Sequence, residues 1–315
     1  MSVPQFAPAI MREIRLLQRL DNWHGPVEAA FHWSIIAAAI ALSMLSWREL
    51  PLAAAIPVYV VVLVVIGGRQ RGLSGLVHQA SHGTFMPSAH GNAVFAALLG
   101  GYPVLQSYTG YQQSHVVLHH GRFGSAKDPD YAFFRDAGLY DEGADSRRLN
   151  RYLFGLLSPI AVLRYAGFVI RNRIWTNDDS QSERLGRLLY YVAAIAAITW
   201  FDVWPYVFGY WFVPLVTTQA WIGAMSELAE HYPFMNRSQR GLIRMSRNRD
   251  FGPLWRLLIG EHRGEGYHLV HHLFPRLPIW NLHRAHRALL ADADYAAIPF
   301  ARSPRQVLHG MRLAL

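Results

Sequence analysis

The sequence contains no cysteine in its 315 residues, which excludes disulfide bonds, iron–sulfur clusters, thiolate-ligated haem and cysteine zinc sites. Any metal in this protein is therefore held by nitrogen and oxygen. Charged residues are also scarce, at 16% of the chain, whereas a soluble domain has roughly 25%. Hydrophobic residues account for 52%. The formal net charge is +9, but its distribution along the chain argues against nucleic acid as a partner.

Four apolar runs predict membrane-spanning helices. Residues 29–47 and 51–68 contain no Asp, Glu, Lys or Arg, and each is about long enough to cross a bilayer. Leu188–Phe201 is shorter, but arginines that precede it can extend the span by snorkelling. Val203–Ser226 is also uncharged. We therefore predict an all-α integral membrane protein with four transmembrane helices in two hairpins.

The basic residues are distributed asymmetrically about these runs. Of the 30 Lys and Arg residues, three precede the first run, thirteen lie in 69–187, thirteen follow residue 226, and only Arg48 falls on the opposite side. By the positive-inside rule, both termini and the long middle segment of this multi-pass protein are predicted to be cytoplasmic. Since we find no repeat, low-complexity tract or linker, we predict one domain over 1–315, including an N-terminal segment at 1–28 and a cytoplasmic tail at 291–315.

Three shorter segments are expected near the membrane surface. Residues 9–20 combine isoleucine and leucine at helical spacing with arginine, which is typical of an interfacial helix and equally of an ordinary solvated helix. Ala93–Gln106 is apolar but short, so it either dips into the bilayer or packs beneath the polar region. Residues 152–170 are interrupted by Pro159 and Arg164, which favours an amphipathic interfacial helix over a spanning one.

Eight of the sixteen histidines form three clusters on the predicted cytoplasmic side. On a helix, residues four apart share a face, so each cluster can direct two or three imidazoles at one point. Neutral imidazole binds iron, zinc, copper and nickel well. Eight imidazoles exceed the coordination number of one metal ion, which predicts two ions in a cytoplasmic helical cap. The clusters are His78 and His82; His115, His119 and His120; and His268, His271 and His272.

Further polar residues are candidates for supporting roles. His231, near the end of the fourth run, is either a ninth metal ligand or a polar residue at a helix end. Metal-bound imidazoles usually donate their second N–H to a carboxylate or carbonyl, and the candidate acids are Asp128, Asp130, Glu227, Glu261 and Glu265. A later group of arginines is expected to hold an anionic head group, to dock an acidic electron carrier, or simply to reflect cytoplasmic topology: Arg237, Arg240, Arg244, Arg247 and Arg249.

The three clusters, in this order and with a helix pair between the second and third, resemble those of the membrane fatty acid desaturase superfamily. The segment 264–275 (GEGYHLVHHLFP) is similar to that superfamily's third histidine box, and 278–282 (PIWNL) to its continuation. The likeness covers roughly residues 30–290. It implies a non-haem di-iron centre, dioxygen as co-substrate, the eight clustered histidines as ligands, and His231 at a position where members vary. The second cluster has three residues before its His-His pair, where two are commoner in acyl desaturases.

The chemistry implied by this resemblance is oxidation of an unactivated C–H bond, which no side chain can perform without a cofactor. Desaturation of a fatty acyl chain or related lipid-like compound in the membrane is expected. The alternative is a hydroxylase or ketolase for alkanes, lipids or carotenoids. No cysteine is available for a fused rubredoxin or ferredoxin, so we expect an external electron donor of the ferredoxin, rubredoxin or cytochrome b5 type. A metal transporter would place its ligands at mid-membrane, and a zinc hydrolase usually needs three protein ligands; both are less favoured.

Overall fold

The structure is a computed structural model that describes residues 4–170, 179–235 and 242–312. Within these ranges nearly all regular structure is helical, which confirms the all-α prediction. The only described sheet is a two-residue parallel pairing of β1 (Asn248–Arg249) with β2 (Phe300–Ala301).

The two longest helices form a hairpin. They are α2 (His24–Glu49) and α3 (Leu52–Ser81), and Pro51, in an extended conformation with φ −63° and ψ 151°, caps the start of α3. Proline fits this position because the first helical residues need no N–H donor. Among the described residues, these are the two helices long and apolar enough to cross a membrane. Because α3 continues well past the uncharged run, it carries the first histidine cluster on its last turn.

The second predicted hairpin is less regular than the sequence suggested. After α9 (Gln181–Trp200), the run predicted as one helix over 203–226 is divided into several pieces. Pro214 lacks an N–H and disrupts a continuous helix, and Thr217 takes the non-helical angles φ −112° and ψ −86°. The hydroxyl of Thr217 donates to the carbonyl of Val213 at 2.6 Å. The pieces are α10 (Trp204–Val207), the π-helix η5 (Phe208–Phe212), α11 (Val213–Val216) and α12 (Thr218–His231).

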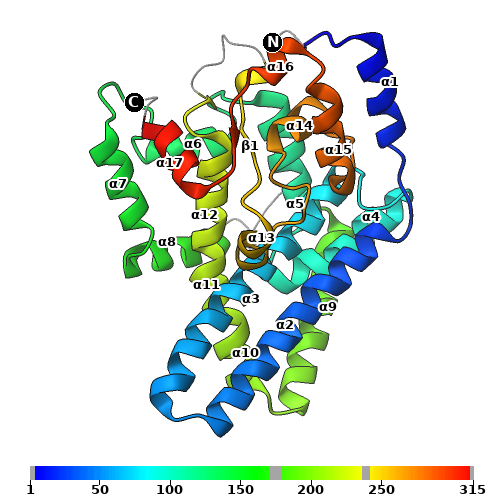
Figure 1. The fold of residues 1–315 in the computed structure, drawn as a ribbon. Coiled ribbons are helices and arrows are strands. Elements are labelled where there is room, and N and C mark those ends of the chain that lie inside the picture. The colour runs from blue at the N-terminus through cyan, green and yellow to red at the C-terminus, as the bar shows by residue number, and fades with distance from the viewer. Residues whose placement is uncertain (1–3, 171–178, 236–241, 313–315) are drawn as a thin grey trace.

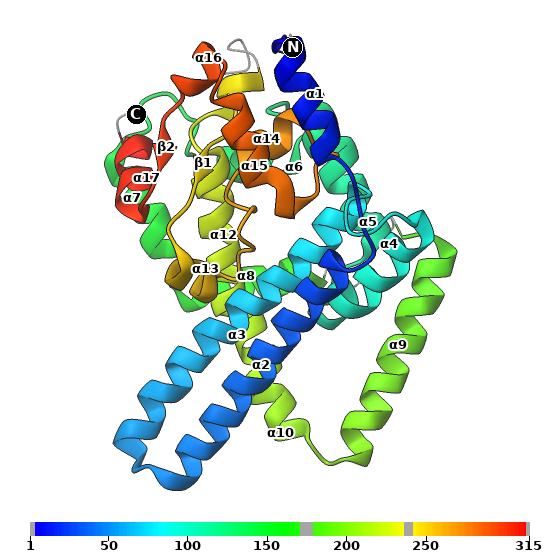
Figure 2. The ribbon, with the colours of Figure 1, turned by 45° about the vertical axis from the view of Figure 1, so that its right-hand side comes forward.

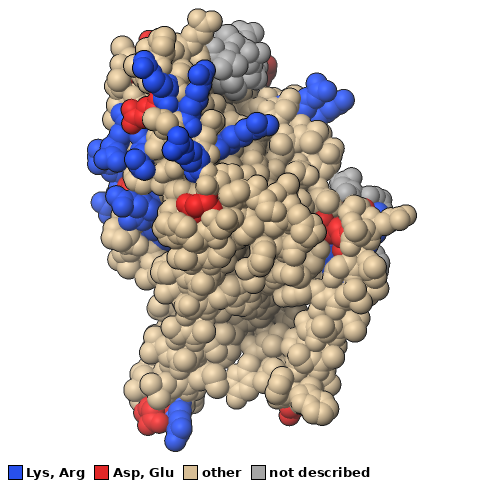
Figure 3. Space-filling model, turned by 90° about the vertical axis from the view of Figure 1, so that its right-hand side faces the viewer, with Lys and Arg blue, Asp and Glu red and all other residues tan. Residues whose placement is uncertain are grey.

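The apolar helices extend together from one end of the molecule. Figures 1 and 2 show that the turn between α2 and α3 and the turn between α9 and α10 lie at the same lower end, while the N-terminal helix and the C-terminal helices lie in the upper part. On the face drawn in Figure 3, Lys and Arg gather on the upper part, and the lower part is uncharged except at its tip. Arg48 and Glu49 form an exposed ion pair in the α2–α3 turn. This distribution suits a protein associated with a membrane through its lower part.

The N-terminal helix α1 (Pro8–Leu17) packs on the protein. Ile10, Ile14 and Leu17 are buried against α15 (Ile279–Leu289), on which Trp280 and Leu282 belong to the same core. The apolar face that the sequence favoured equally for a membrane surface or for solvent is therefore covered by the protein itself. The reason is that α15 offers a complementary apolar face, a long-range partner that the local pattern of residues 9–20 cannot reveal.

Residues 89–104 form a compact layer against α3. The carbonyl of Leu73 on α3 lies where a Cβ on Gly100 would be, so this layer approaches α3 as closely as two backbones can. The segment thus packs beneath the histidine-bearing end of α3, which is one of the two positions the sequence predicts for it. Its elements are α4 (Ala89–Ala96), the π-helix η1 (Ala97–Gly101) and the 3₁₀ helix η2 (Tyr102–Val104).

Residues 146–169 form two short helices with no spanning segment between them. Helix α7 (Ser146–Gly155) ends before Ser158, whose hydroxyl accepts from the backbone N–H of Ala161 and begins α8 (Pro159–Val169). Phe154 and Leu163 are 74% and 72% exposed, so this pair of helices presents apolar side chains to its surroundings. This placement suits the predicted interfacial segment better than a spanning one.

The C-terminal third of the chain folds over the end of α3. Asn248 connects its parts: its Oδ1 accepts from the backbone N–H groups of Leu269 and Val270, and its Nδ2 donates to the hydroxyl of Tyr295 at 2.8 Å. These bonds fix the start of α14 (His268–Leu273), which carries the third histidine cluster. The remaining elements are η7 (Leu242–Arg244), α13 (Pro253–Ile259), α16 (Ala293–Ala296) and α17 (Pro304–Arg312).

Two glycines bring this third of the chain onto α3. A Cβ on Gly68 of α3 would collide with the carbonyl oxygen of Leu258, and a Cβ on Gly260 would collide with the carbonyl oxygen of Gly68. Gly260 also has φ +76°, which other residues rarely adopt. The close approach of α13 to α3 therefore requires glycine on both sides.

Candidate metal centre

The structure brings the nine sequence-predicted histidines together in two adjacent groups. In each group the nearest ligand nitrogens all lie within 4.8 Å of one another. The groups adjoin, because the rings of His120 and His272 stack with centroids 4.4 Å apart. The five-histidine group contains His78, His82, His115, His120 and His271; the four-histidine group contains His119, His231, His268 and His272.

The second and third sequence clusters are each divided between the two groups. His115 and His120 join one group and His119 the other, because residues 112–120 form the π-helix η3 (Gln112–His120), which follows α5 (Tyr108–Tyr111). A π-helix aligns residues five apart, and Nε2 of His115 and His120 are 3.2 Å apart. His115 and His119 still lie side by side, with stacked rings whose centroids are 5.1 Å apart, as their spacing of four residues predicts.

The spacing of the nitrogens fits ions shared by each group. Nitrogens that bind one ion at about 2.1 Å lie roughly 3.0–3.4 Å from one another in octahedral or tetrahedral geometry. The Nε2 atoms of His78 and His271 are 3.0 Å apart, and those of His271 and His120 are 3.1 Å apart. In the four-histidine group, Nε2 of His268 lies 3.0 Å from His231 and 3.1 Å from His272. Buried Nε2 of His82 has no hydrogen-bond partner in the described structure, which leaves a lone pair directed at its group.

The protein surroundings keep most of these imidazoles neutral. Burial, with the charge of His119, lowers the pKa of His82 to about 4. Burial and the neighbouring imidazoles also lower the pKa of His271 and His272 well below the usual value. A neutral imidazole has a lone pair available for a metal, so the low pKa values favour metal binding over protonation at neutral pH.

His119 differs because two carboxylates face its ring. Its Nδ1–H donates to Asp128 at 3.1 Å and to Asp130 at 2.9 Å. Burial lowers the pKa of His119, but the two aspartates outweigh burial and raise it to about 10. Asp128 is itself fixed as the N-cap of α6 (Pro129–Asp136) and accepts from the backbone N–H of Gly124. The pair therefore orients Nε2 of His119 toward His272, as carboxylates do at metal-bound histidines.

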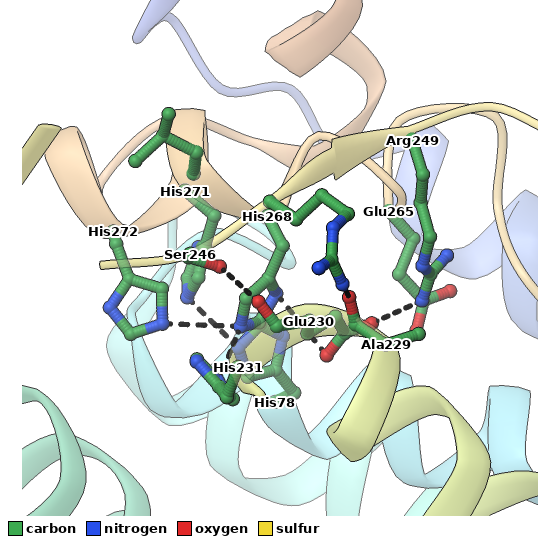
Figure 4. A network of polar contacts seen from close by, with 12 residues as sticks. His78, Ala229, Glu230, His231, Ser246, Arg249, Glu265, His268, His271 and His272 are labelled. Carbon is green, nitrogen blue, oxygen red and sulfur yellow. Dashed lines mark hydrogen bonds and ion pairs between the residues drawn. The ribbon is translucent and has the colours of Figure 1, made fainter. Parts of the chain in front are cut away.

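A buried charge network supports the four-histidine group from behind. Glu230, the residue before His231, lies 3.5 Å from Nδ1 of His268 and also pairs with Arg249 and Arg71. Figure 4 shows Glu230 and Arg249 beside the histidines of both groups. Sequence analysis did not single out Glu230 or Arg71. The sequence shows that Glu230 precedes His231 and that Arg71 precedes His78, but the residues with which they form ion pairs come from distant segments.

The other predicted supporting acids contact arginines or the cavity. Glu261 pairs with Arg249, and Glu265 pairs with Arg71 at 2.7 Å. A carboxylate oxygen of Glu227 on α12 lies within 4.8 Å of a carboxylate oxygen of Asp130 and of a ring nitrogen of His231. Glu227 also lines a cavity. Of the predicted arginines, Arg247 and Arg249 are buried, so they are unavailable to a head group or a donor protein. Arg237 and Arg240 lie outside the described residues, and Arg244 is exposed.

A cavity of about 1680 Å³ gives access to the histidines. His78, His115 and His271 of the five-histidine group and His268 of the four-histidine group line it. From there it extends along α12 to the helices α7 and α8. A small or medium-sized organic molecule can therefore reach histidines of both groups.

Comparison with known proteins agrees with the geometry. The model of the family described as "Fatty acid desaturase" matches residues 54–304. The chain belongs to the fatty acid desaturase family. It is 34% identical to the dihydrorhizobitoxine desaturase of Bradyrhizobium elkanii over 307 residues, which cover 93% of this chain and 83% of that protein. It is 27% identical to the beta-carotene ketolase of Paracoccus sp. (strain PC1) over 225 residues, which cover 69% of this chain and 74% of the ketolase.

Proposed function

We propose that this desaturase-family protein is a membrane-bound, dioxygen-dependent oxidoreductase whose nine histidines hold two iron ions. The observation that carries the proposal is the assembly of these imidazoles into two adjoining groups with the spacing expected of shared ligands. Ligands that are all nitrogen suit iron, and the absence of cysteine leaves no thiolate to favour a softer metal. The iron pair would supply the power to activate dioxygen and remove hydrogen from carbon.

The proposed reaction is desaturation of a fatty acyl chain or a related lipid-like compound. Two hydrogens leave adjacent carbons and a double bond forms; dioxygen, two electrons and two protons complete the balance as two molecules of water. An external ferredoxin, rubredoxin or cytochrome b5 type protein would supply the electrons. Within this scheme, the cavity positions the substrate beside the histidines, Asp128 and Asp130 orient His119, and Glu230 holds the ring of His268.

We further propose that the protein is multi-pass, with its termini and histidine groups on the cytoplasmic side. The uncharged lower part and the basic upper part of the molecule support this orientation. In this arrangement α2 and α3 would cross the bilayer, and α9 with the broken run 204–216 would form the second hairpin. The interfacial position of α7 and α8 would then place one end of the cavity near the membrane surface.

Oxygen insertion by a hydroxylase or ketolase is the second candidate. It is favoured by the similarity to a beta-carotene ketolase and by the three-residue interval before His119 and His120. The two outcomes start with the same hydrogen removal and differ in whether a second hydrogen leaves or oxygen is transferred to the carbon. Small differences in substrate position decide between them, so the ligand set favours neither.

The test is to supply the purified, iron-loaded protein with a reductant, dioxygen and candidate lipids, and to identify products by mass spectrometry. Loss of two hydrogens would support desaturation, and a gain of oxygen would support the second candidate. A His271→Ala variant, with exposed His90 changed to alanine as the matched control, ties the product to the site. Iron-dependent product in the wild type and in the control, but not in His271→Ala, is expected; equal product in all three would contradict the proposal.

A further inference from the structure

Helix α15 is a single layer between the helix that carries the third histidine cluster and the surface. Ala285 and Leu289 of α15 are buried in the same core as Val270 of α14. An α-helix with its side chains is about 10–12 Å thick, so only this thickness of protein separates α14 from the outer face of α15. The outer face of α15 is therefore a part of the surface from which the histidine groups are within short reach.

The outer face of α15 is basic. Arg284 and Arg287 are exposed there, and Arg263, in the loop before α14, is also exposed. Burial, together with the charges of these three arginines, lowers the pKa of His283, so the three guanidinium groups lie around one ring. None of them forms an ion pair or a side-chain hydrogen bond with a residue that the structure describes. Residues 276–312 contain six arginines and only two aspartates, which leaves this positive charge largely uncompensated.

A cluster of partly exposed aromatic rings adjoins these arginines on α15. The centroid of the His286 ring lies 5.1 Å from that of Tyr267 and 5.1 Å from that of Phe300, and all three residues are partly exposed. The guanidinium carbon of Arg302 lies 5.4 Å from the centroid of the Phe300 ring. Tyr267 is bonded directly to His268, a member of the four-histidine group. An electron that enters at this cluster is therefore one peptide bond from a proposed metal ligand.

The position of this basic surface does not suit contact with a bilayer. Figures 1 and 2 place α14 and α15 in the upper part of the molecule, away from the turns that end the apolar helices, and Figure 3 shows Lys and Arg gathered on the upper part. Anionic lipid attracts basic residues only near the membrane surface, because the attraction falls off within a Debye length of about 8 Å at physiological salt. A soluble acidic partner, in contrast, can approach the upper part freely.

We propose that a small, acidic, one-electron redox protein docks on the outer face of α15 and supplies the electrons of the reaction. The inference rests on the proposed function and specifies the partner's charge and the surface that it meets. Two reduced partners each lose one electron per turnover, and the two electrons join two protons and the two substrate hydrogens in reducing dioxygen to water. The α15 surface consists of Arg263, Arg284, Arg287 and Arg302 around the rings of Tyr267 and His286.

The composition of the α15 surface suits such a brief encounter. Arginine and tyrosine are enriched at protein interfaces, and contacts between redox proteins are typically small. Complementary charge raises the rate of encounter more than the final affinity, which is what a carrier that must dock and leave requires. The α15 surface differs from the arginines that the sequence favoured for this role, of which Arg247 and Arg249 are buried.

The experiment uses the iron-loaded protein in neutral detergent with an acidic [2Fe–2S] ferredoxin as the probe. Isothermal titration measures binding, and anaerobic stopped-flow mixing with the reduced ferredoxin measures electron transfer. At about 0.01 M salt, where the Debye length is about 30 Å, we expect Arg284→Glu combined with Arg287→Glu to lower the affinity and the second-order rate constant at least roughly tenfold. At about 1 M salt, where the Debye length is about 3 Å, the difference from the wild type should largely disappear.

The matched control is Arg147→Glu combined with Arg151→Glu, which makes the same change of net charge at exposed arginines of α7. Figure 1 shows α7 on the opposite side of the molecule from α15. The control should stay close to the wild type, and thermal melting of each variant verifies folding. The proposal would be overturned by a control as impaired as the α15 variant, by an α15 variant that behaves as the wild type, or by a wild type that does not bind ferredoxin at low salt.

Two further measurements separate this proposal from a lipid contact and from the proposed function. A loss of stability of the α15 variant in nanodiscs of anionic but not neutral lipid, with ferredoxin binding unchanged, would assign the arginines to the bilayer instead. Product formed with dithionite, a small reductant that needs no docking surface, is measured in the same preparations. Iron-dependent product with dithionite, but ferredoxin binding that ignores α15, would refute the docking surface and leave the function standing. Ferredoxin binding through α15 by a protein that holds no iron would refute the function instead.

Discussion

His119 and Asp128 form a hydrogen-bonded pair at 3.1 Å in which both side chains are completely shielded from solvent. Asp128 simultaneously caps α6 and accepts from the backbone N–H of Gly124, so its carboxylate is fixed by main-chain groups. The hydrogen bond to Asp128 therefore fixes the ring of His119 relative to the N-terminus of α6. This relationship makes the four-histidine group depend on a residue that does not belong to it.

Replacing Asp128 with asparagine should weaken metal binding more than folding. Asparagine retains the helix cap and can still accept from Nδ1–H of His119, but it removes one of the two negative charges that make the imidazole a stronger ligand, leaving Asp130 alone. We expect the affinity of one iron to fall by about 10–100-fold. Iron release to a chelator, followed by absorbance, measures this. Asp145→Asn, at the exposed N-cap of α7, is the control and should retain iron; equal retention by both variants would contradict the role of Asp128.

The contact between Gly68 and α13 makes a prediction about stability. Gly68→Ala places a methyl group against the carbonyl oxygen of Leu258, so α13 must move away from α3. We expect a loss of about 1–3 kcal/mol and a lower melting temperature in detergent. Gly167→Ala in α8 is the matched control, because nothing lies near its added Cβ and alanine favours a helix. A Gly68→Ala variant as stable as this control would show that the close approach is unnecessary.

Replacing the buried arginine of the charge network should reduce the free energy of unfolding more than replacing an exposed arginine. Arg249 is 1% exposed and pairs with both Glu230 and Glu261. Arg249→Met leaves buried Glu261 without its cation and Glu230 with Arg71 alone, at 3.7 Å, and we expect about 3–5 kcal/mol of destabilisation. The exposed pair of Arg135 and Asp136 provides the comparison, since Arg135→Met should cost less than about 1 kcal/mol. Chemical unfolding of both variants gives the difference, and similar losses would contradict the network's structural role.

Acid should displace the metal only at low pH. With the pKa of His82 lowered to about 4, protons compete with a metal for this imidazole only as the pH approaches that value. We expect bound iron to persist at about pH 5.5 and to be lost toward pH 4. In metal-free protein the same lowered pKa means that the unfolded chain binds more protons, so stability declines as the pH falls from about 6.5 toward 4. Iron loss centred near the ordinary histidine pKa of about 6.5 would contradict the burial of these ligands.

Features that depend on residues close together in the chain could be predicted from the sequence. Histidine spacing identified eight of the nine members of the two groups, and His231 was a candidate from its place near the end of the fourth run. Hydropathy identified the hairpin of α2 and α3. Pro214 within the fourth run was a readable sign of a broken helix, although the uncharged composition suggested a continuous one. These properties depend on neighbours in the chain, so a single sequence carries them.

The division of the clusters between the two groups was beyond the sequence. It depends on the π-helix at His115–His120, whose register α-helical spacing does not predict. The network of Glu230 with Arg71 and Arg249 likewise joins residues from three distant segments. Packing of α1 on α15 is a third example, because an apolar face can meet a membrane or another helix with the same sequence pattern. Long-range contacts decide each of these cases.

The central claim is that the two histidine groups each hold an iron ion. The most direct measurement is the iron content of the purified, reconstituted protein, compared with variants that remove one ligand from each group, His120→Ala and His268→Ala. The account predicts two irons per chain in the wild type and a selective loss of one in each single variant, with both lost in the double variant. A single iron in the wild type, or iron content unaffected by either substitution, would contradict it.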